Sequence, residues 1–317
     1  MQTTDLVQPF QLDRPNLRGR LVRLGPAVAA IIKRHDYPPA IAKLLAETLT
    51  LAVLLAGMLK YDGIFTLQAK GNGPVKLLLV DVSHTGALRG YAQFDPAALA
   101  TLGKKPSAHA LLGSGHIAFT VDQGLGRDRY QGIVEMTGTT LSDFVQNYFR
   151  QSEQIDTAIT VSAFQHPVLG WQAAGLMLQR LPEQADQLVG IDEEDDWRRV
   201  MMLMSTATPD ELVSPALSPL DLLYRLFHEE EVRVYPPMDI ADQCRCSRER
   251  VEGVLRTLPE EDIGDITRDG PAEIRCEFCS RAYHFTAEEI LTLKQKRGSS
   301  EDGDDEGDTP VPPRALH

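Results

Sequence analysis

The pattern of apolar positions in the N-terminal half predicts one long buried helix followed by a series of strands. Residues 41–60 are almost all apolar, and their uncharged part, residues 48–59, is too short to cross a bilayer. We therefore expect a core helix there, with Asp36 and Gly63 marking the turns at its two ends.

Short apolar runs separated by glycine-containing turns follow this helix and are typical of strands. The expected strands cover residues 64–71, 75–82, 88–94, 116–122, 130–136, 158–164 and 173–181. Residues 140–154 interrupt them with apolar side chains at helical spacing. Because helices and strands do not alternate regularly, the pattern favours a sheet-rich α+β domain, residues 1–182, over a doubly wound parallel sheet.

Residues 183–230 differ from this domain and predict a helical linker, because five consecutive acids at 192–196 precede a tryptophan and three methionines. In one interpretation, an amphipathic helix packs its apolar side chains on the first domain; these are Val200, Met201, Leu203 and Met204. In the other, the segment is an adaptable surface that binds varied apolar partners through Trp197, Met201, Met202 and Met204. Both interpretations hold if the helix can detach.

All four cysteines of the chain lie in one C-terminal module, residues 231–297. A Cys-x-Cys pair, Cys244 and Cys246, and a Cys-x-x-Cys pair, Cys276 and Cys279, together form the ligand set of a four-thiolate metal site. One Zn²⁺ per chain is the expected metal. An iron–sulfur cluster is the chemical alternative, although the spacing fits neither common ferredoxin pattern.

The rest of this module has few large apolar side chains, and a domain of that size commonly needs a metal to fold. Ser247 is expected to cap one helix, and Thr286 with Glu289 forms a capping box ahead of another. Structural zinc contributes roughly 10–16 kcal/mol in finger peptides at standard state. Disulfides within the two cysteine pairs would close very short loops and contribute only about 2 kcal/mol each, so oxidation is expected to unfold the module.

Composition and charge narrow the function classes. A chain of 317 residues with 43% hydrophobic content can bury one large core beside a smaller domain. A formal net charge of −13 disfavours nucleic-acid binding. Residues 298–317 hold six acids and one arginine, which predicts a disordered acidic tail. The N-terminal residues show no basic segment followed by an apolar run, so we expect a cytoplasmic protein that binds no membrane.

Other candidate chemistry is weak, and we expect no enzymatic activity. The glycine-containing segments 71–74 and 124–128 lack the residues of a nucleotide-binding loop, and no pair of carboxylates is singled out for acid–base catalysis. His35, His228 and His284 are possible metal ligands, but four cysteines already complete a tetrahedral site.

Six segments resemble one family of bacterial proteins, the redox-regulated holdase chaperones known as the heat-shock protein of thirty-three kilodaltons. The matching segments, with the cysteine signature among them, are residues 35–38, 129–138, 147–154, 223–235, 244–262 and 276–285. The resemblance extends to about residue 297, and the acidic tail departs from the pattern.

The resemblance implies a redox-switched, ATP-independent chaperone for unfolding client proteins. In such a protein the reduced form holds zinc and is inactive; an oxidant expels the metal, two disulfides form, and the zinc domain and linker unfold. The oxidised form is commonly a homodimer. Cys244, Cys246, Cys276 and Cys279 would then be both zinc ligands and redox centre.

An alternative from a different class is a zinc-ribbon adaptor or a nucleic-acid-binding protein with a purely structural metal. The net charge argues against nucleic acid, although residues 245–256 are locally basic.

Overall fold

The computed structural model describes residues 5–14, 16–124, 129–180, 193–268 and 270–298. The chain divides into two compact units, Met1–Cys244 and Arg245–His317. The segment predicted as a linker therefore belongs to the first unit as far as it is described, and the division into four parts stays a prediction. The predicted disordered tail, apart from residue 298, lies outside the described residues.

In the described residues, the strands of the first unit are β1 (Leu6–Leu12), β2 (Leu17–Leu24), β3 (Ile64–Gly71), β4 (Val75–Ser83), β5 (Ala87–Phe94), β6 (Gly115–Asp122), β7 (Tyr130–Glu135), β8 (Thr157–His166), β9 (Gly170–Arg180), β10 (Val232–Val234), β11 (Met238–Asp239) and β12 (Ala241–Asp242). Its helices are α1 (Pro26–Lys33), α2 (Pro39–Ala56), α3 (Pro96–Ala100), α4 (Ala108–Leu112), α5 (Leu141–Tyr148), the π-helical η1 (Phe149–Glu153), α6 (Glu193–Ser205), α7 (Pro209–Val213), α8 (Pro219–Phe227) and the 3₁₀ turn η2 (His228–Glu230).

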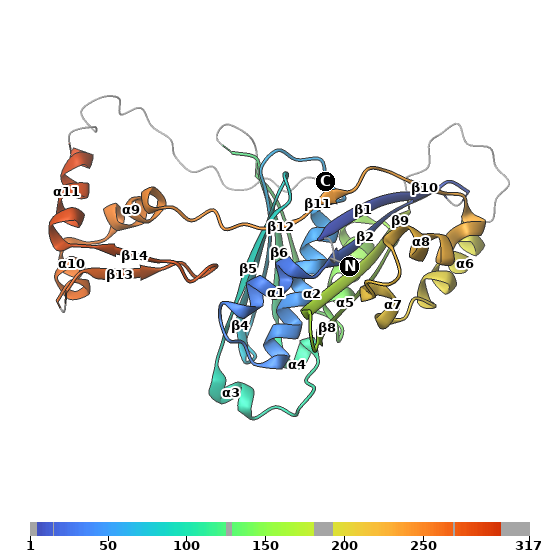
Figure 1. Cartoon of the computed structure of the whole chain (residues 1–317), viewed down its shortest axis with the longest axis horizontal. Helices are drawn as coiled ribbons and strands as arrows, with labels where there is room; N and C mark the ends of the chain where they lie inside the picture. The colour runs from blue at the N-terminus through green and yellow to red at the C-terminus, as the bar shows by residue number, and fades with distance from the viewer. Residues whose placement is uncertain (1–4, 15, 125–128, 181–192, 269, 299–317) are drawn as a thin grey trace. The chain divides into compact units, whose positions relative to one another are not determined.

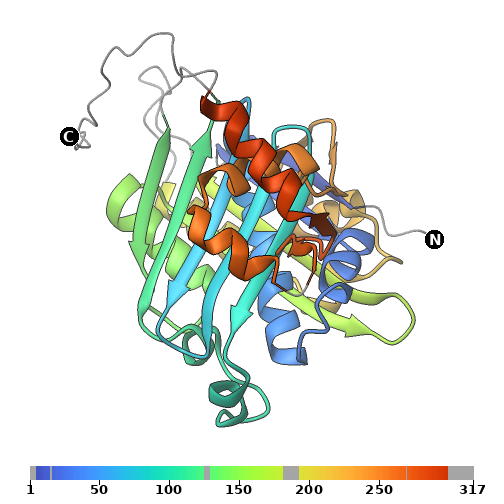
Figure 2. The ribbon, with the colours of Figure 1, turned by 90° about the vertical axis from the view of Figure 1, so that its left-hand side faces the viewer.

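Two sheets form the first unit, which confirms the α+β class (Figure 1). One has the order β10-β1-β2-β9-β8, with β11 also paired to β1, and all its described pairs are antiparallel. The other has the order β12-β5-β4-β3-β6-β7 and is seen face on in Figure 2. In this second sheet β12 runs parallel to β5, so the chain just before Cys244 is anchored to the first unit.

Helix α2 contacts both sheets and carries the core of the first unit. The segment Pro39–Met58 is long and apolar enough to cross a bilayer, but 83% of its most apolar window is buried inside the protein. Two threonines on the helix are completely buried, and their hydroxyls donate to carbonyls one turn earlier, Thr48 to Leu44 at 2.7 Å and Thr50 to Ala46 at 2.9 Å. These bonds satisfy the buried hydroxyls, and the prediction of a core helix is confirmed.

Strands β1 and β2 were not predicted from the sequence, yet they lie within the first sheet. Their side chains alternate between two faces, so that Val7 and Val22 meet the α2 core while Phe10 and Leu21 face the other side. Gly19 pairs with Phe10, and a Cβ at this glycine would lie 2.1 Å from the ring. The glycine therefore lets the ring lie across β2.

In the part of the second unit that the structure describes, one hairpin lies with three helices. Its elements are β13 (Ala272–Arg275), β14 (Ala282–Phe285), α9 (Arg248–Thr257), α10 (Glu260–Ile266) and α11 (Ala287–Gly298). Its hydrophobic cluster contains six buried residues among those described: Leu255, Ile263, Ala272, Tyr283, Phe285 and Ile290. A cluster of this size gives the unit little apolar burial of its own.

Candidate metal centre and covered sheet face

The four cysteines come together in space as their spacing predicted. The Sγ atoms of Cys244, Cys246, Cys276 and Cys279 all lie within 4.8 Å of one another, and each residue is half-buried. The sulfurs of Cys246 and Cys279 are 3.3 Å apart. Four sulfurs at these distances could hold one metal ion.

Local hydrogen bonds position each of the two cysteine pairs. Ser247 follows Cys246 directly, and its hydroxyl accepts from the backbone N–H of Arg250 at 3.3 Å, so the first pair ends where α9 begins. The second pair lies in the turn between β13 and β14. There the N–H of Cys276 donates to Arg281 O at 3.0 Å, and the N–H of Ser280 donates to Cys276 O at 2.8 Å.

Donors and cations surround the sulfurs. The hydroxyl of Tyr283 donates to Cys246 Sγ at 3.2 Å, and this bond, with burial, raises the pKa of the tyrosine. A hydrogen bond with Tyr283 and the nearby charges of Cys246 and Cys279 raise the pKa of Arg281. Arg89 places its Nη1 3.9 Å from Cys244 Sγ. Such neighbours stabilise thiolates, the form in which cysteine binds metal and reacts with oxidants.

Arg248 links the helix after the first pair to the hairpin that carries the second. Its guanidinium lies over the ring of Phe285, 4.1 Å from the centroid, donates to His284 O at 3.1 Å and pairs with Glu289 at 2.8 Å. Glu289 also accepts from the N–H of Thr286 at 2.8 Å, while Thr286 Oγ1 accepts from the N–H of Glu289 at 3.2 Å. The predicted capping box is therefore present.

The histidines considered as ligands are not part of the cysteine group. His35 stacks on Tyr37, and His228 contacts the carbonyl of Tyr224 at 3.1 Å. His284 is 60% exposed and lies 3.9 Å from Glu273. Within the described residues, the cysteine group is the one set of three or more candidate ligands close enough to hold a metal.

The second feature is an apolar face of the first sheet, covered by the helices of the predicted linker. We call it the covered face; its sheet residues are Phe10, Leu12, Leu17, Leu21, Ala174, Leu176 and Leu178. Figure 1 shows α6, α7 and α8 beside this sheet on the side away from α2. The buried linker residues of the same cluster are Val200, Met204, Leu212, Val213, Leu222, Leu223, Leu226 and Phe227.

The residues predicted to bind clients do not all point the same way. Met204 is buried in this cluster, Trp197 and Met201 are partly buried against it, and Met202 is 69% exposed. Packing of α6 on the sheet, the first of the two interpretations, therefore describes this state of the molecule. Three of the four residues become fully accessible only if the helix detaches.

Two arginines hold the linker in place, one between its own helices and one from the sheet, and no sequence pattern predicted either contact. Arg199 forms two hydrogen bonds with the buried carboxylate of Glu230, at 2.7 and 2.9 Å. From the sheet, Arg23 donates to the carbonyls of Glu211, Ser214 and Leu217. Burial lowers the pKa of Arg23 to about 10, so it remains a cation near neutral pH. Their partners lie 31 to 194 residues away, which is why sequence patterns missed them.

Comparison with known proteins gives consistent matches over nearly the whole chain. A family model described as Hsp33 protein matches residues 5–286. A 33 kDa chaperonin of Caulobacter vibrioides is 38% identical over 286 residues, which cover 88% of this chain and 94% of that protein. A 33 kDa chaperonin of Pseudomonas syringae pv. tomato is 40% identical over 292 residues, covering 91% and 93%.

A solved structure agrees with the fold. The crystal structure of the 33 kDa chaperonin of Thermotoga maritima superposes with a TM-score of 0.78 at 20% identity, covering 94% of this chain and all of that one.

Proposed function

The chain belongs to the Hsp33 family, and on that premise we propose that it is a redox-regulated, ATP-independent holdase chaperone. It protects thermally unfolding or oxidatively damaged proteins from aggregation. The observation that carries the proposal is the gathering of all four cysteines of the chain within 4.8 Å.

The resident metal of this proposal is one Zn²⁺ per chain. In a tetrahedral site with Zn–S bonds of about 2.3 Å, the sulfurs are about 3.8 Å apart. The Cys246–Cys279 separation of 3.3 Å lies below this value, and the limit of 4.8 Å on all the separations lies above it. Cys244, Cys246, Cys276 and Cys279 would hold the ion, which would contribute folding free energy to a unit with a small hydrophobic cluster.

Oxidation acts on these same four residues. As each disulfide forms, two thiolates lose two electrons and one peroxide molecule is reduced to water. A disulfide sulfur no longer carries the charge that binds zinc, so the metal leaves. The reduced, zinc-bound form is inactive, and loss of the metal unfolds the second unit and releases the linker.

Client proteins then bind the apolar surface that the linker had covered. Detachment exposes the covered face, together with Trp197, Met201 and Met204, which join the already exposed Met202. Such a surface suits the apolar segments of unfolding proteins, because contiguous exposed apolar area is the usual signal of a protein-binding site. Methionine side chains adapt to varied partners.

The protein acts in the cytoplasm, forms a homodimer when oxidised, and binds neither nucleic acid nor membrane. The locally basic segment 245–256 gives little support to the nucleic-acid alternative, because Glu252 pairs with Arg248 at 3.4 Å and with Arg256 at 4.0 Å.

The test treats the reduced, zinc-loaded protein with peroxide at mild heat. Zinc release and suppression of the aggregation of a thermally unfolding test protein are followed together. We expect both to appear at the same rate and both to be reversed by a thiol reductant. Equal suppression before oxidation, or none after it, would show that the metal is purely structural and that the switch does not exist.

A further inference from the structure

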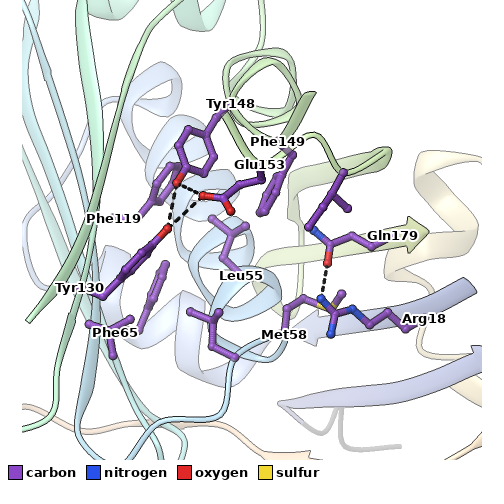
Figure 3. Close-up of a pocket in the computed structure, with 13 residues that line it drawn as sticks. Arg18, Leu55, Met58, Phe65, Phe119, Tyr130, Tyr148, Phe149, Glu153 and Gln179 are labelled. Atoms are coloured by element: carbon purple, nitrogen blue, oxygen red, sulfur yellow. Dashed lines mark hydrogen bonds between the residues drawn. The ribbon is translucent and has the colours of Figure 1, made fainter. Parts of the chain in front are cut away.

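The first unit contains a cavity that the proposed chaperone function does not use. It has a volume of about 160 Å³ and receives residues from both sheets, α2, α5 and η1 (Figure 3). Its apolar wall includes Leu55, Met58, Phe65, Phe119, Tyr148 and Phe149. A cavity of about 150 Å³ lined by apolar side chains holds one benzene molecule, so this one has room for a six-membered ring.

One side of the cavity presents a cation with an unused donor. Arg18 on β2 lines the cavity, and its buried Nε–H has no hydrogen-bond partner among the described residues. Its Nη2 donates to Gln179 Oε1 at 3.0 Å, and Gln179 is itself held by the hydroxyl of Thr157 at 3.1 Å. The guanidinium is therefore held at the wall of the cavity, where it places a positive charge beside the apolar side chains.

Burial makes that donor costly to leave unpaired. Desolvation lowers the pKa of Arg18, which shows that the charged form lacks some of the solvation it has in water. An anionic oxygen that pairs with the guanidinium inside the cavity would restore part of this lost solvation, and a carboxylate suits the planar geometry of a guanidinium.

The opposite side of the cavity is polar but already satisfied. Glu153 Oε1 accepts from Tyr148 Oη at 2.5 Å and from Tyr130 Oη at 3.0 Å, and the two hydroxyl oxygens lie 3.1 Å apart. Gly132 allows this approach, since a Cβ there would lie 2.6 Å from the hydroxyl of Tyr148. Figure 3 shows Glu153 and Arg18 on different sides of the cavity. The negative charge of Glu153 therefore directs an anionic group away from itself and toward Arg18.

We propose that this cavity binds a small amphipathic monocarboxylate, whose ring or short chain packs among the aromatic side chains and whose carboxylate pairs with the guanidinium of Arg18. The charge arrangement sets the orientation, and the volume limits the apolar part to about the size of a benzene ring. This site is independent of the cysteines and of the linker, so it stands or falls separately from the redox switch.

The test compares benzoate with benzamide, which has the same number of non-hydrogen atoms but no charge. Binding to the full-length, reduced, metal-loaded protein is measured by calorimetry and by NMR of the aromatic rings. We expect benzoate to bind at least about tenfold more tightly than benzamide, because the carboxylate pairs its own negative charge with the guanidinium while the amide oxygen of benzamide is uncharged. Ring signals of Phe65 and Phe119 should shift on binding.

Two variants test whether Arg18 causes the preference for benzoate over benzamide. Arg18→Gln should make the two probes bind equally. Arg20→Gln is the matched control, because Arg20 lies on the same face of β2 but donates to the carbonyls of Gly57 and Gly19 and does not line the cavity. It should keep the tenfold preference for benzoate.

Three results would overturn the proposal. The first is that the unmodified protein binds benzamide as tightly as benzoate or more tightly, which would point instead to an uncharged apolar occupant. The second is that benzoate binds without shifting the signals of the cavity rings. The third is that benzoate does not bind at tens of millimolar. If Arg18→Gln does not fold, the benzoate-to-benzamide ratio and the ring shifts of the unmodified protein still decide.

Discussion

The two units of the chain differ sharply in the hydrophobic core they contain. In the first unit, α2 alone buries fourteen residues between two sheets. In the second, the cluster has six buried residues among those described, and half-buried Cys246 packs against it. Burial of apolar surface is the dominant favourable term in folding, so the first unit can fold on its core while the second needs another source of free energy.

The difference explains why a redox signal would act on one unit and spare the other. An oxidant removes thiolates and leaves apolar side chains almost unchanged, so it removes metal-derived stability and little else. All four cysteines belong to the candidate metal site, and the large core contains none of them. Such a switch would unfold the second unit and release the linker, while α2 and the two sheets keep their structure.

Removal of the metal should have the largest effect, and it should act on the second unit alone. Chelation of the reduced protein should unfold the second unit, because structural zinc contributes roughly 10–16 kcal/mol at standard state. Amide exchange is the measurement: protection should be lost in α9 and in the β13–β14 hairpin and kept in α2. If the hairpin amides stay protected after complete chelation, the small cluster suffices by itself and the metal has no folding role.

A cavity in the large core should produce the next largest effect. Leu45 is completely buried, and Leu45→Ala should lower the free energy of unfolding of the first unit by about 2–5 kcal/mol. Zinc content should not change. Leu220→Ala is the control, since Leu220 is 50% exposed and its truncation should cost less than about 0.5 kcal/mol. Urea denaturation followed by far-UV circular dichroism measures both, and equal costs for the two variants would contradict the assigned core.

A single helix cap in the first unit should give the smallest effect. Asp143 Oδ2 accepts from the N–H groups of Thr139 and Thr140, both at 2.9 Å. Burial acts to raise the pKa of this carboxyl, but these hydrogen bonds outweigh it and hold the pKa below its ordinary value of 3.8. Asp143→Asn should cost about 0.5–1 kcal/mol near neutral pH, because the carboxylate is partly exposed and screened.

The pH dependence of that variant has a definite sign. A carboxyl with a lowered folded-state pKa stabilises the protein above its unfolded-state pKa, and this contribution is lost as the pH falls through the lowered value. The difference between Asp143→Asn and the unmodified protein should therefore shrink below pH 3.8. A difference that stays constant down to the acid transition would assign the effect to packing.

Local patterns predicted much of the fold and most of the metal centre. The helix cap at Ser247 and the capping box at Thr286 are both present. Each depends on residues within one helical turn. Strands β1 and β2 were missed because Pro9 interrupts the apolar pattern of β1 and because β2 pairs with β9, more than a hundred residues away. The predicted helix at 140–154 ends at Tyr148 and continues as the π-helical turn that places Glu153.

The sequence by itself determined which four cysteines could hold a metal ion, where the helix caps lie and that α2 is apolar. Each helix cap and each cysteine pair involves residues that are close along the chain, where backbone geometry fixes their spacing. Only the tertiary structure decided that Met204 is covered while Met202 is exposed, and that Arg18 faces an aromatic cavity with a donor to spare. Such features arise because strands far apart in sequence pair and bring their faces together, and no local pattern encodes which faces will meet.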